Sequence, residues 1–144
     1  MTSFIVSTNE EVCNSVTYSV TTISCDVIMS VSVKDIYNSY TIEKAESELK
    51  YYLQEDEIKY LERVIDIRKL ISLIRLLESL GLHVEDVEIV AEEQEIVFIE
   101  IMIDIKCDMK SWTTFTKNIK KYLKESGFSD ITKIVAILCH FDKS

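Results

Sequence analysis

The sequence predicts an α+β domain in which an antiparallel sheet carries two long helices on one face. Residues 58–82 begin with an amphipathic pattern and become apolar nearly all round before Gly81, so a helix here must be covered on several sides. Short stretches with strand-like alternation or apolar runs flank this helix, at residues 23–33, 84–91, 96–105 and 131–141. We therefore expect the strands and a second helix to pack around the central one.

Size and composition indicate one domain over residues 1–144, because a chain of this length can bury a sizeable core without staples. Hydrophobic residues at 47% and charged residues at 28% are ordinary globular values and exclude global disorder. No apolar stretch reaches the roughly 20 residues that cross a bilayer, and the N-terminus lacks a secretory pattern. We expect a cytoplasmic protein without membrane contact.

The formal net charge of -9 argues against a broad nucleic-acid surface, which would need clustered Lys and Arg. The chain has no proline and only two glycines, so few turns can be tight or left-handed at low cost. This composition resembles that of small intracellular proteins of thermophilic archaea and their viruses.

The four cysteines, at positions 13, 25, 107 and 139, have no CxxC spacing and no His/Cys spacing typical of zinc sites. Reduced buried thiols are the ordinary expectation. Cys25 and Cys139 have matching parity in two strands that we expect to be neighbours, so both should face the same core layer. A disulfide between them is left open.

The elements follow one another as strand, helix, strand, strand, helix, strand. Residues 16–20 alternate like an extra N-terminal strand, and the alternation changes phase at Thr21 before the longer strand 23–33. A helix begins near Ile42, and its apolar face fails after Leu53. We therefore predict a break at 54–57, with Asp56 as cap of the central helix, although residues 42–82 could form one helix or two.

The second half begins with a hairpin formed by residues 84–91 and 96–105. Asp108 or Ser111 caps the next helix, which Gly127 ends, and the strand 131–141 follows. The apolar positions of this helix recur at helical spacing: Trp112, Phe115, Ile119, Tyr122 and Leu123. Two halves joined by a hairpin resemble the ferredoxin-like split βαβ plan, which implies the antiparallel strand order 4-1-3-2.

In that plan the odd-numbered residues of strands 23–33 and 96–105 face the helices. The other face would then be too apolar for a monomer to leave bare. Its interface candidates are Ile28, Ile96, Phe98, Met102 and Leu138. The chain itself, a homodimer, or another protein or ligand could cover this face.

Carboxylates at the strand ends are the metal candidates. Strands 23–33 and 96–105 would be parallel neighbours, so Asp35 could meet Asp104 or Asp108 and hold Mg²⁺. The segment Val33-Lys34-Asp35-Ile36 resembles the strand end of the small CRISPR-associated nucleases of this fold, which implies a Mg²⁺-dependent nuclease as one alternative.

Other catalytic patterns are missing from the sequence. With glycines only at 81 and 127, a phosphate-binding loop is excluded. Cys139 and His140 are adjacent in a strand and point to opposite faces, so they do not form one site. His83 follows the central helix and should interact with its dipole. We assign no catalytic residue and no cofactor.

Charge is separated along the second half of the chain. The hairpin residues 85–104 contain acids and no Lys or Arg, whereas the following helix carries a basic patch, Lys117, Lys120, Lys121 and Lys124. Such a patch is commonly a solvated helix face, but the separation favours oriented association. The sequence therefore predicts a non-enzymatic interaction or assembly protein that self-associates as a homodimer. The alternatives are the nuclease and a small-molecule-sensing regulatory domain.

Overall fold

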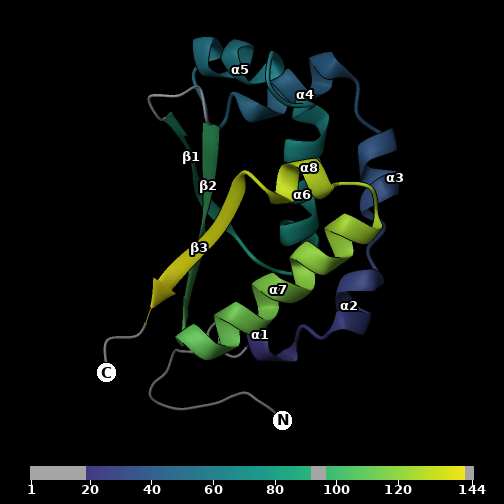
Figure 1. Cartoon of the computed structure of the whole chain (residues 1–144), viewed down its shortest axis with the longest axis vertical. Coiled ribbons are helices and arrows are strands. Elements are labelled where there is room, and N and C mark those ends of the chain that lie inside the picture. Colours follow the sequence, from purple (N-terminus) through teal and green to yellow (C-terminus); the bar gives the residue numbers. More distant parts are fainter. Residues whose placement is uncertain (1–18, 92–96, 142–144) are drawn as a thin grey trace.

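The sheet has three strands in the order β1-β2-β3, and helices cover one of its faces (Figure 1). This computed structural model describes residues 19–91 and 97–141. The helices are α1 (Ser19–Thr22), α2 (Cys25–Met29), α3 (Val33–Asn38), α4 (Ile42–Leu49), α5 (Glu55–Glu62), α6 (Ile67–Ser79), α7 (Met109–Glu125) and α8 (Ser129–Thr132). The strands are β1 (Val84–Ala91), β2 (Val97–Cys107) and β3 (Val135–Phe141). The α+β class is confirmed, and no described helix is long and apolar enough to cross a membrane.

The expected ferredoxin-like sheet of four antiparallel strands is wrong. The stretch predicted as the first strand, 23–33, contains α2 and the start of α3 instead. Two serines that would have formed the polar face of that strand cap these helices: the Ser24 hydroxyl accepts from Val27 N and the Ser32 hydroxyl from Asp35 N. The expected extra N-terminal strand, residues 16–20, is not found either, because α1 begins at Ser19; residues 16–18 lie outside the described part.

The sheet is mixed as a consequence. β1 and β2 form the predicted antiparallel hairpin, with Ile89 opposite Ile99. β3 pairs in parallel with β2, with Ile137 opposite Ile101, and so takes the position beside the central strand that the first strand was expected to occupy. The chain crosses from β2 to β3 through α7, as a parallel pair requires.

The central helix is shorter than predicted. It begins at Ile67, because Asp66 caps α6 by accepting a hydrogen bond from Arg68 N at 3.0 Å. The preceding turns form the separate helix α5, which begins with a capping box between Gln54 and Glu57 rather than with Asp56. A break separates α4 from α5, but it lies between Leu49 and Glu55, earlier than the predicted 54–57, because residues 55–57 already belong to α5. A second break, between Glu62 and Ile67, was not predicted.

Helix α7 agrees with its prediction. Asp108 caps it, and the helix gives way to Gly127, whose φ of 87° is left-handed. The side chains at helical spacing, Trp112, Phe115, Ile119 and Leu123, are buried. The indole Nε1 of Trp112 donates to the carbonyl of Ile137 at 3.0 Å, which fastens α7 to β3.

The core lies between the sheet and helices α6 and α7. The inward side chains of β2 at Ile99, Ile101 and Ile103 have no exposed surface, as the parity of the strand predicts. The expectation that Cys25 and Cys139 share a core layer is wrong: Cys25 is an exposed thiol on α2, whereas Cys139 is buried on β3.

Candidate functional site

The face of the sheet that the helices leave uncovered is the candidate site, and we call it the open face. Its side chains alternate along the strands with the buried ones: Asp86, Glu88, Val90, Phe98, Glu100, Met102, Asp104, Lys106, Ala136, Leu138 and His140. All of them are exposed or half-buried, and Phe98 keeps 39% of its surface. Of the predicted interface residues, Phe98, Met102 and Leu138 lie here.

The other two predicted interface residues do not extend this surface. Ile28 is a buried residue of α2, which packs on α7, and it is therefore part of the core. Ile96 lies outside the described residues. The exposed apolar residues of α2 are instead Val27 and Met29, which were expected to face the helices.

Acidic residues dominate the open face. Glu88 lies directly opposite Glu100 in the β1–β2 ladder, and like charges in such a cross-strand pair repel each other. Within the described residues, no Lys or Arg forms an ion pair with either glutamate. The single lysine of this face, Lys106, lies near its end, beside His140. The open face therefore carries uncompensated negative charge next to apolar side chains.

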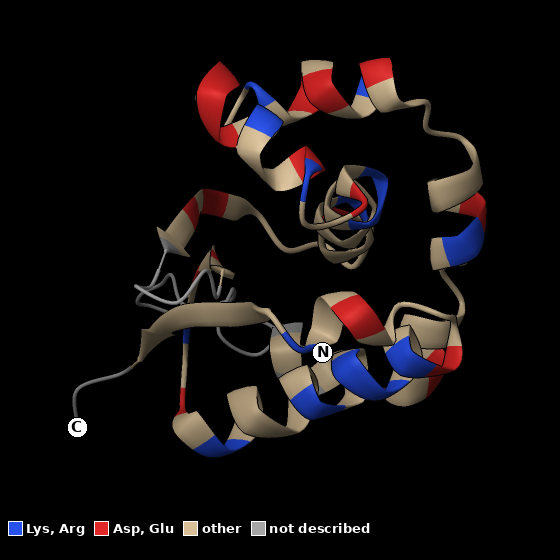
Figure 2. Ribbon diagram, turned by 45° about the horizontal axis from the view of Figure 1, so that its top comes forward, with Lys and Arg blue, Asp and Glu red and all other residues tan. Residues whose placement is uncertain are grey.

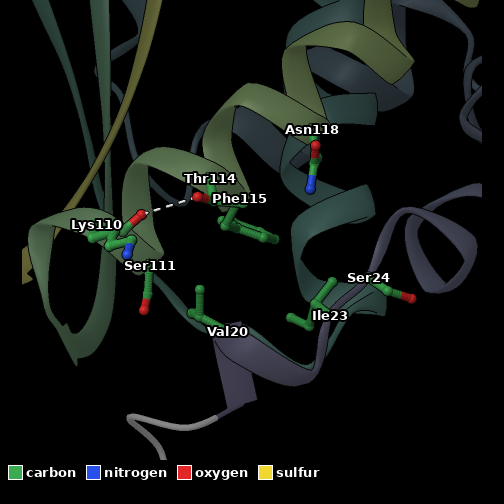
Figure 3. A pocket seen from close by; sticks show the side chains of 8 residues that line it. All are labelled: Val20, Ile23, Ser24, Lys110, Ser111, Thr114, Phe115 and Asn118. Carbon is green, nitrogen blue, oxygen red and sulfur yellow. Dashed lines mark hydrogen bonds between the residues drawn. The ribbon is translucent and has the colours of Figure 1, made fainter.

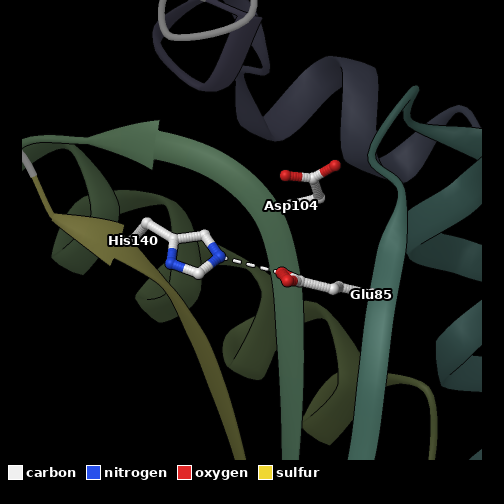
Figure 4. A group of neighbouring side chains, drawn as sticks. All are labelled: Glu85, Asp104 and His140. Carbon is white, nitrogen blue, oxygen red and sulfur yellow. Dashed lines mark hydrogen bonds and ion pairs between the residues drawn. The ribbon is translucent and has the colours of Figure 1, made fainter.

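Two irregularities in strand pairing bring three side chains together at one end of the open face. The β1–β2 register shifts between Val84 and Asp86, and the β2–β3 register shifts between Met102 and Lys106. At this end the Nε2 atom of His140 lies 2.8 Å from Oε1 of Glu85 (Figure 4). One ligand-type atom from each of Glu85, Asp104 and His140 lies within 4.8 Å of the other two. All three side chains are exposed.

A hollow of about 250 Å³ lies on the open face beside this cluster. Met102 and Leu138 supply apolar surface to it, and acidic side chains and His140 supply the rest. The complete lining is Glu85, Asp86, Glu88, Glu100, Met102, Leu138 and His140. Such a surface attracts cations and positively charged partners.

The opposite charge lies on α7. Lys117, Lys121 and Lys124 recur at i, i+4 and i+7, are exposed, and form what we call the basic strip, on the side of α7 opposite its buried residues. Figure 2 shows the blue positions along this helix. Lys120, also predicted in this patch, is half-buried at its margin. No described residue forms an ion pair with these lysines.

The predicted magnesium ligands do not share a strand edge. Asp35 lies in α3, so the parallel strands that were to bring it to Asp104 do not exist. The Asp108 carboxylate accepts from Ser111 N at 2.9 Å, and this backbone hydrogen bond lowers the pKa of Asp108 below its usual value. Asp108 is thereby occupied as a helix cap, and only Asp104 belongs to the cluster on the open face.

A larger hollow of about 450 Å³ separates α1 from the start of α7 (Figure 3). Its apolar part comes from Val20, Ile23 and Phe115, and its polar part from Ser24, Lys110, Ser111, Thr114 and Asn118. The Thr114 hydroxyl donates to the carbonyl of Lys110 at 3.1 Å, within the helix. The lining contains one charged side chain and no paired acid and base, so it offers no catalytic arrangement.

A hydrogen-bonded group around Arg75 joins α4 to α6 and has a structural role. Arg75 donates to Glu48 at 2.7 Å and also bonds Glu78 and Tyr40. Partial burial alone would lower the pKa of Arg75, but the hydrogen bonds to Glu48, Tyr40 and Glu78 outweigh it and raise that pKa. The guanidinium stays charged and has its partners within the protein.

Sequence reasoning placed His140 on the correct face but did not connect it with Asp104 or Glu85. The link between Asp104 and His140 depends on β3 lying next to β2, which the expected strand order excluded. Glu85 has the parity of a buried residue and reaches the open face only through the register shift. Comparison of the chain with protein-family models, with curated proteins and with solved structures finds no match.

Proposed function

We propose that the protein is a non-catalytic assembly protein that associates with further copies of itself. The open face of one copy docks on the basic strip of the next. A single observation carries this proposal: among the described residues, Glu88 and Glu100 on the open face and the lysines of the basic strip on α7 have no ion-pair partner. Opposite charges placed in this way orient association between copies.

The charge of the open face favours this head-to-tail contact over a two-fold dimer. In a two-fold dimer the same patch meets itself, so Glu88 and Glu100 of one copy would lie near the same glutamates of the other. A close contact between like charges costs free energy, and the pair already repels within one chain. Lysines of a second copy would neutralise it instead.

The apolar side chains of the open face fit the same contact. Phe98, Met102 and Leu138 lie beside the acids and need a partner that also covers apolar surface. Lysine side chains can do both, because their methylene stems lie along apolar surface while the ammonium groups reach an acid. A contact between two different surfaces repeats from copy to copy, so the product is a ring or an open chain.

Charge reversal tests the proposal. In Glu88→Lys/Glu100→Lys the open face becomes basic, and in Lys117→Glu/Lys121→Glu the basic strip becomes acidic. By sedimentation velocity at micromolar concentration and low salt, we expect the native chain to assemble and each variant alone to be monomeric. An equimolar mixture of the two variants should assemble, because each then offers the complement of the other. High salt should weaken every assembly.

The control is Lys34→Glu/Lys50→Glu, which changes net charge as much as the strip variant does but lies on exposed positions of α3 and the end of α4. It should assemble like the native chain. A native chain that stays monomeric at low salt would overturn the proposal. A strip variant that still assembles would overturn the head-to-tail contact and favour a two-fold dimer through the open face.

The two other functions expected from the sequence have less support. The nuclease depended on Asp35 at a strand end, and that residue lies in α3. A small-molecule sensor would need a pocket at a dimer edge. The hollow on the open face is instead lined mainly by acids.

A further inference from the structure

We propose that Glu85, Asp104 and His140 bind a Zn²⁺ ion at one end of the open face. This inference does not depend on self-association, because all three ligands come from one chain. The three side chains belong to β1, β2 and β3, and their ligand atoms already lie within 4.8 Å of one another (Figure 4). Three protein ligands with further positions open to water is a common arrangement for zinc.

The separations of the three ligand atoms, from 2.8 Å to within 4.8 Å, bracket the separation that zinc requires. Bonds of about 2.1 Å in a tetrahedral site place neighbouring ligand atoms about 3.4 Å apart. The carboxylates and the imidazole are exposed, so each can move by the distance that this requires. Nε2 of His140 and Oε1 of Glu85 are now 2.8 Å apart, and an ion between them replaces their hydrogen bond with two metal bonds.

Two independent irregularities of the fold create the cluster. In a regular ladder Glu85 would point to the face opposite Asp86, and the shift between Val84 and Asp86 prevents this. The second shift, between Met102 and Lys106, sets the position of His140 relative to Asp104. Register irregularities that redirect side chains are common beside functional sites.

The donor set selects among divalent cations. Mg²⁺ and Ca²⁺ prefer oxygen ligands and octahedral or larger shells, whereas an imidazole nitrogen favours zinc and its neighbours. Asp86, Glu88 and Glu100 line the adjoining hollow and add negative potential that concentrates a cation there. Lys106 lies beside His140 and opposes this, but its charge is at the end of an exposed, flexible stem.

Calorimetric titration of the full chain tests the site, with Zn²⁺ and then Mg²⁺ as probes. We expect one Zn²⁺ per chain and much weaker Mg²⁺ binding. His140→Ala, Glu85→Gln and Asp104→Asn should each weaken Zn²⁺ binding at least about tenfold. Loss of a residue that only orients a metal ligand already lowers metal affinity by about that factor, and loss of a ligand should lower it by more. Asp86→Asn removes one charge from the same hollow but no ligand, because Oδ1 of Asp86 accepts from Val87 N at 2.9 Å. As the matched control, it should weaken Zn²⁺ binding much less than any of the three ligand variants.

The two histidines of the chain give a second readout. Zn²⁺ should shift the ring ¹⁵N signals of His140 and leave those of His83, which lines a separate hollow with Tyr51 and Tyr52, unchanged. Equal shifts of both rings, or unchanged affinity in His140→Ala, would show adventitious zinc only and overturn the site. The variants at Glu85, Asp104 and His140 change exposed side chains, and circular dichroism checks that these variants fold.

The same titration on Lys117→Glu/Lys121→Glu separates this inference from the assembly proposal. That variant should bind Zn²⁺ as the native chain does, whether or not it assembles. Loss of zinc binding there, with native secondary structure, would show that the ion needs a second copy and would overturn a site made within one chain.

Discussion

The two faces of β2 carry different kinds of residues. The face toward the helices presents Ile99, Ile101 and Ile103, which have no exposed surface. The open face, one residue out of phase, presents Glu100, Met102 and Asp104, all at least partly exposed. The apolar burial that stabilises the fold and the exposed polar side chains of the open face therefore lie on opposite sides of a single strand.

The separation follows from what covers each face. Helices α6 and α7 supply apolar side chains to the inner face, and the free energy of unfolding comes largely from that burial. The open face has no such cover within the described residues, so its acids lie in contact with water. Substitutions on the two faces should therefore differ in kind as well as in size.

The largest expected effect is on the inner face. Ile101→Ala should lower the free energy of unfolding by about 2–5 kcal/mol, because it leaves a cavity in a fully buried layer. The matched variant on the open face, Met102→Ala, should cost about 1 kcal/mol or less, since Met102 is half-exposed. Urea unfolding of both variants measures the difference. Equal losses would mean that the open face is buried in the native protein.

A smaller difference is expected between two aspartates at the same end of the sheet. Asp108 caps α7 by accepting a hydrogen bond from Ser111 N, whereas Asp104 belongs to the cluster with Glu85 and His140 on the open face. Measured with a chelator present, Asp108→Ala should lower the thermal midpoint and Asp104→Ala should leave it nearly unchanged.

The effect of Asp108→Ala also depends on pH. The pKa of Asp108 is lower in the folded chain than in the unfolded chain, so its contribution to stability is full above the unfolded pKa of about 3.9 and is lost as the pH falls through the lower, folded value. The native chain and Asp108→Ala should therefore converge in stability on acidification below about pH 4. A constant difference down to pH 2 would contradict the assignment of Asp108 as a charged cap.

The smallest expected effect has the opposite sign. Glu88→Gln removes one charge from the Glu88–Glu100 pair and should stabilise the isolated chain by up to about 1 kcal/mol at low salt. At high salt the gain should shrink, because screening already weakens the repulsion. The same substitution should weaken assembly. A destabilised Glu88→Gln would mean that Glu88 makes a favourable contact in the folded chain.

The sequence predicted the elements whose signals are local and agree with one another. In α7, the cap at Asp108, the apolar spacing from Trp112 to Leu123 and the stop at Gly127 all indicate one helix. In β2, strict alternation predicted which side chains are buried, and so placed Phe98 and Met102 on the open face. These outcomes depend on nearest neighbours along the chain, which a sequence displays directly.

The stretch 23–33 shows where local signals were insufficient. Its alternation of β-branched and small polar residues fits a strand, yet the same serines serve as helix caps. Tertiary contacts favour the helices: Ile28 is buried, and α2 packs on α7. The Tyr122 hydroxyl on α7 donates to the carbonyl of Val31 and accepts from Val33 N at 3.1 Å, which holds the turn between α2 and α3.

The sequence by itself determined the alternation within each strand, the apolar face of α7 and the separation of acids from lysines, because each depends on residues only a few positions apart. The tertiary structure alone decided that β3 pairs with β2 and that both ladders slip at one end. Glu85, Asp104 and His140 meet only through that pairing. Strand pairing depends on contacts between residues distant in the chain, and the energies of those contacts leave no periodic pattern in the sequence.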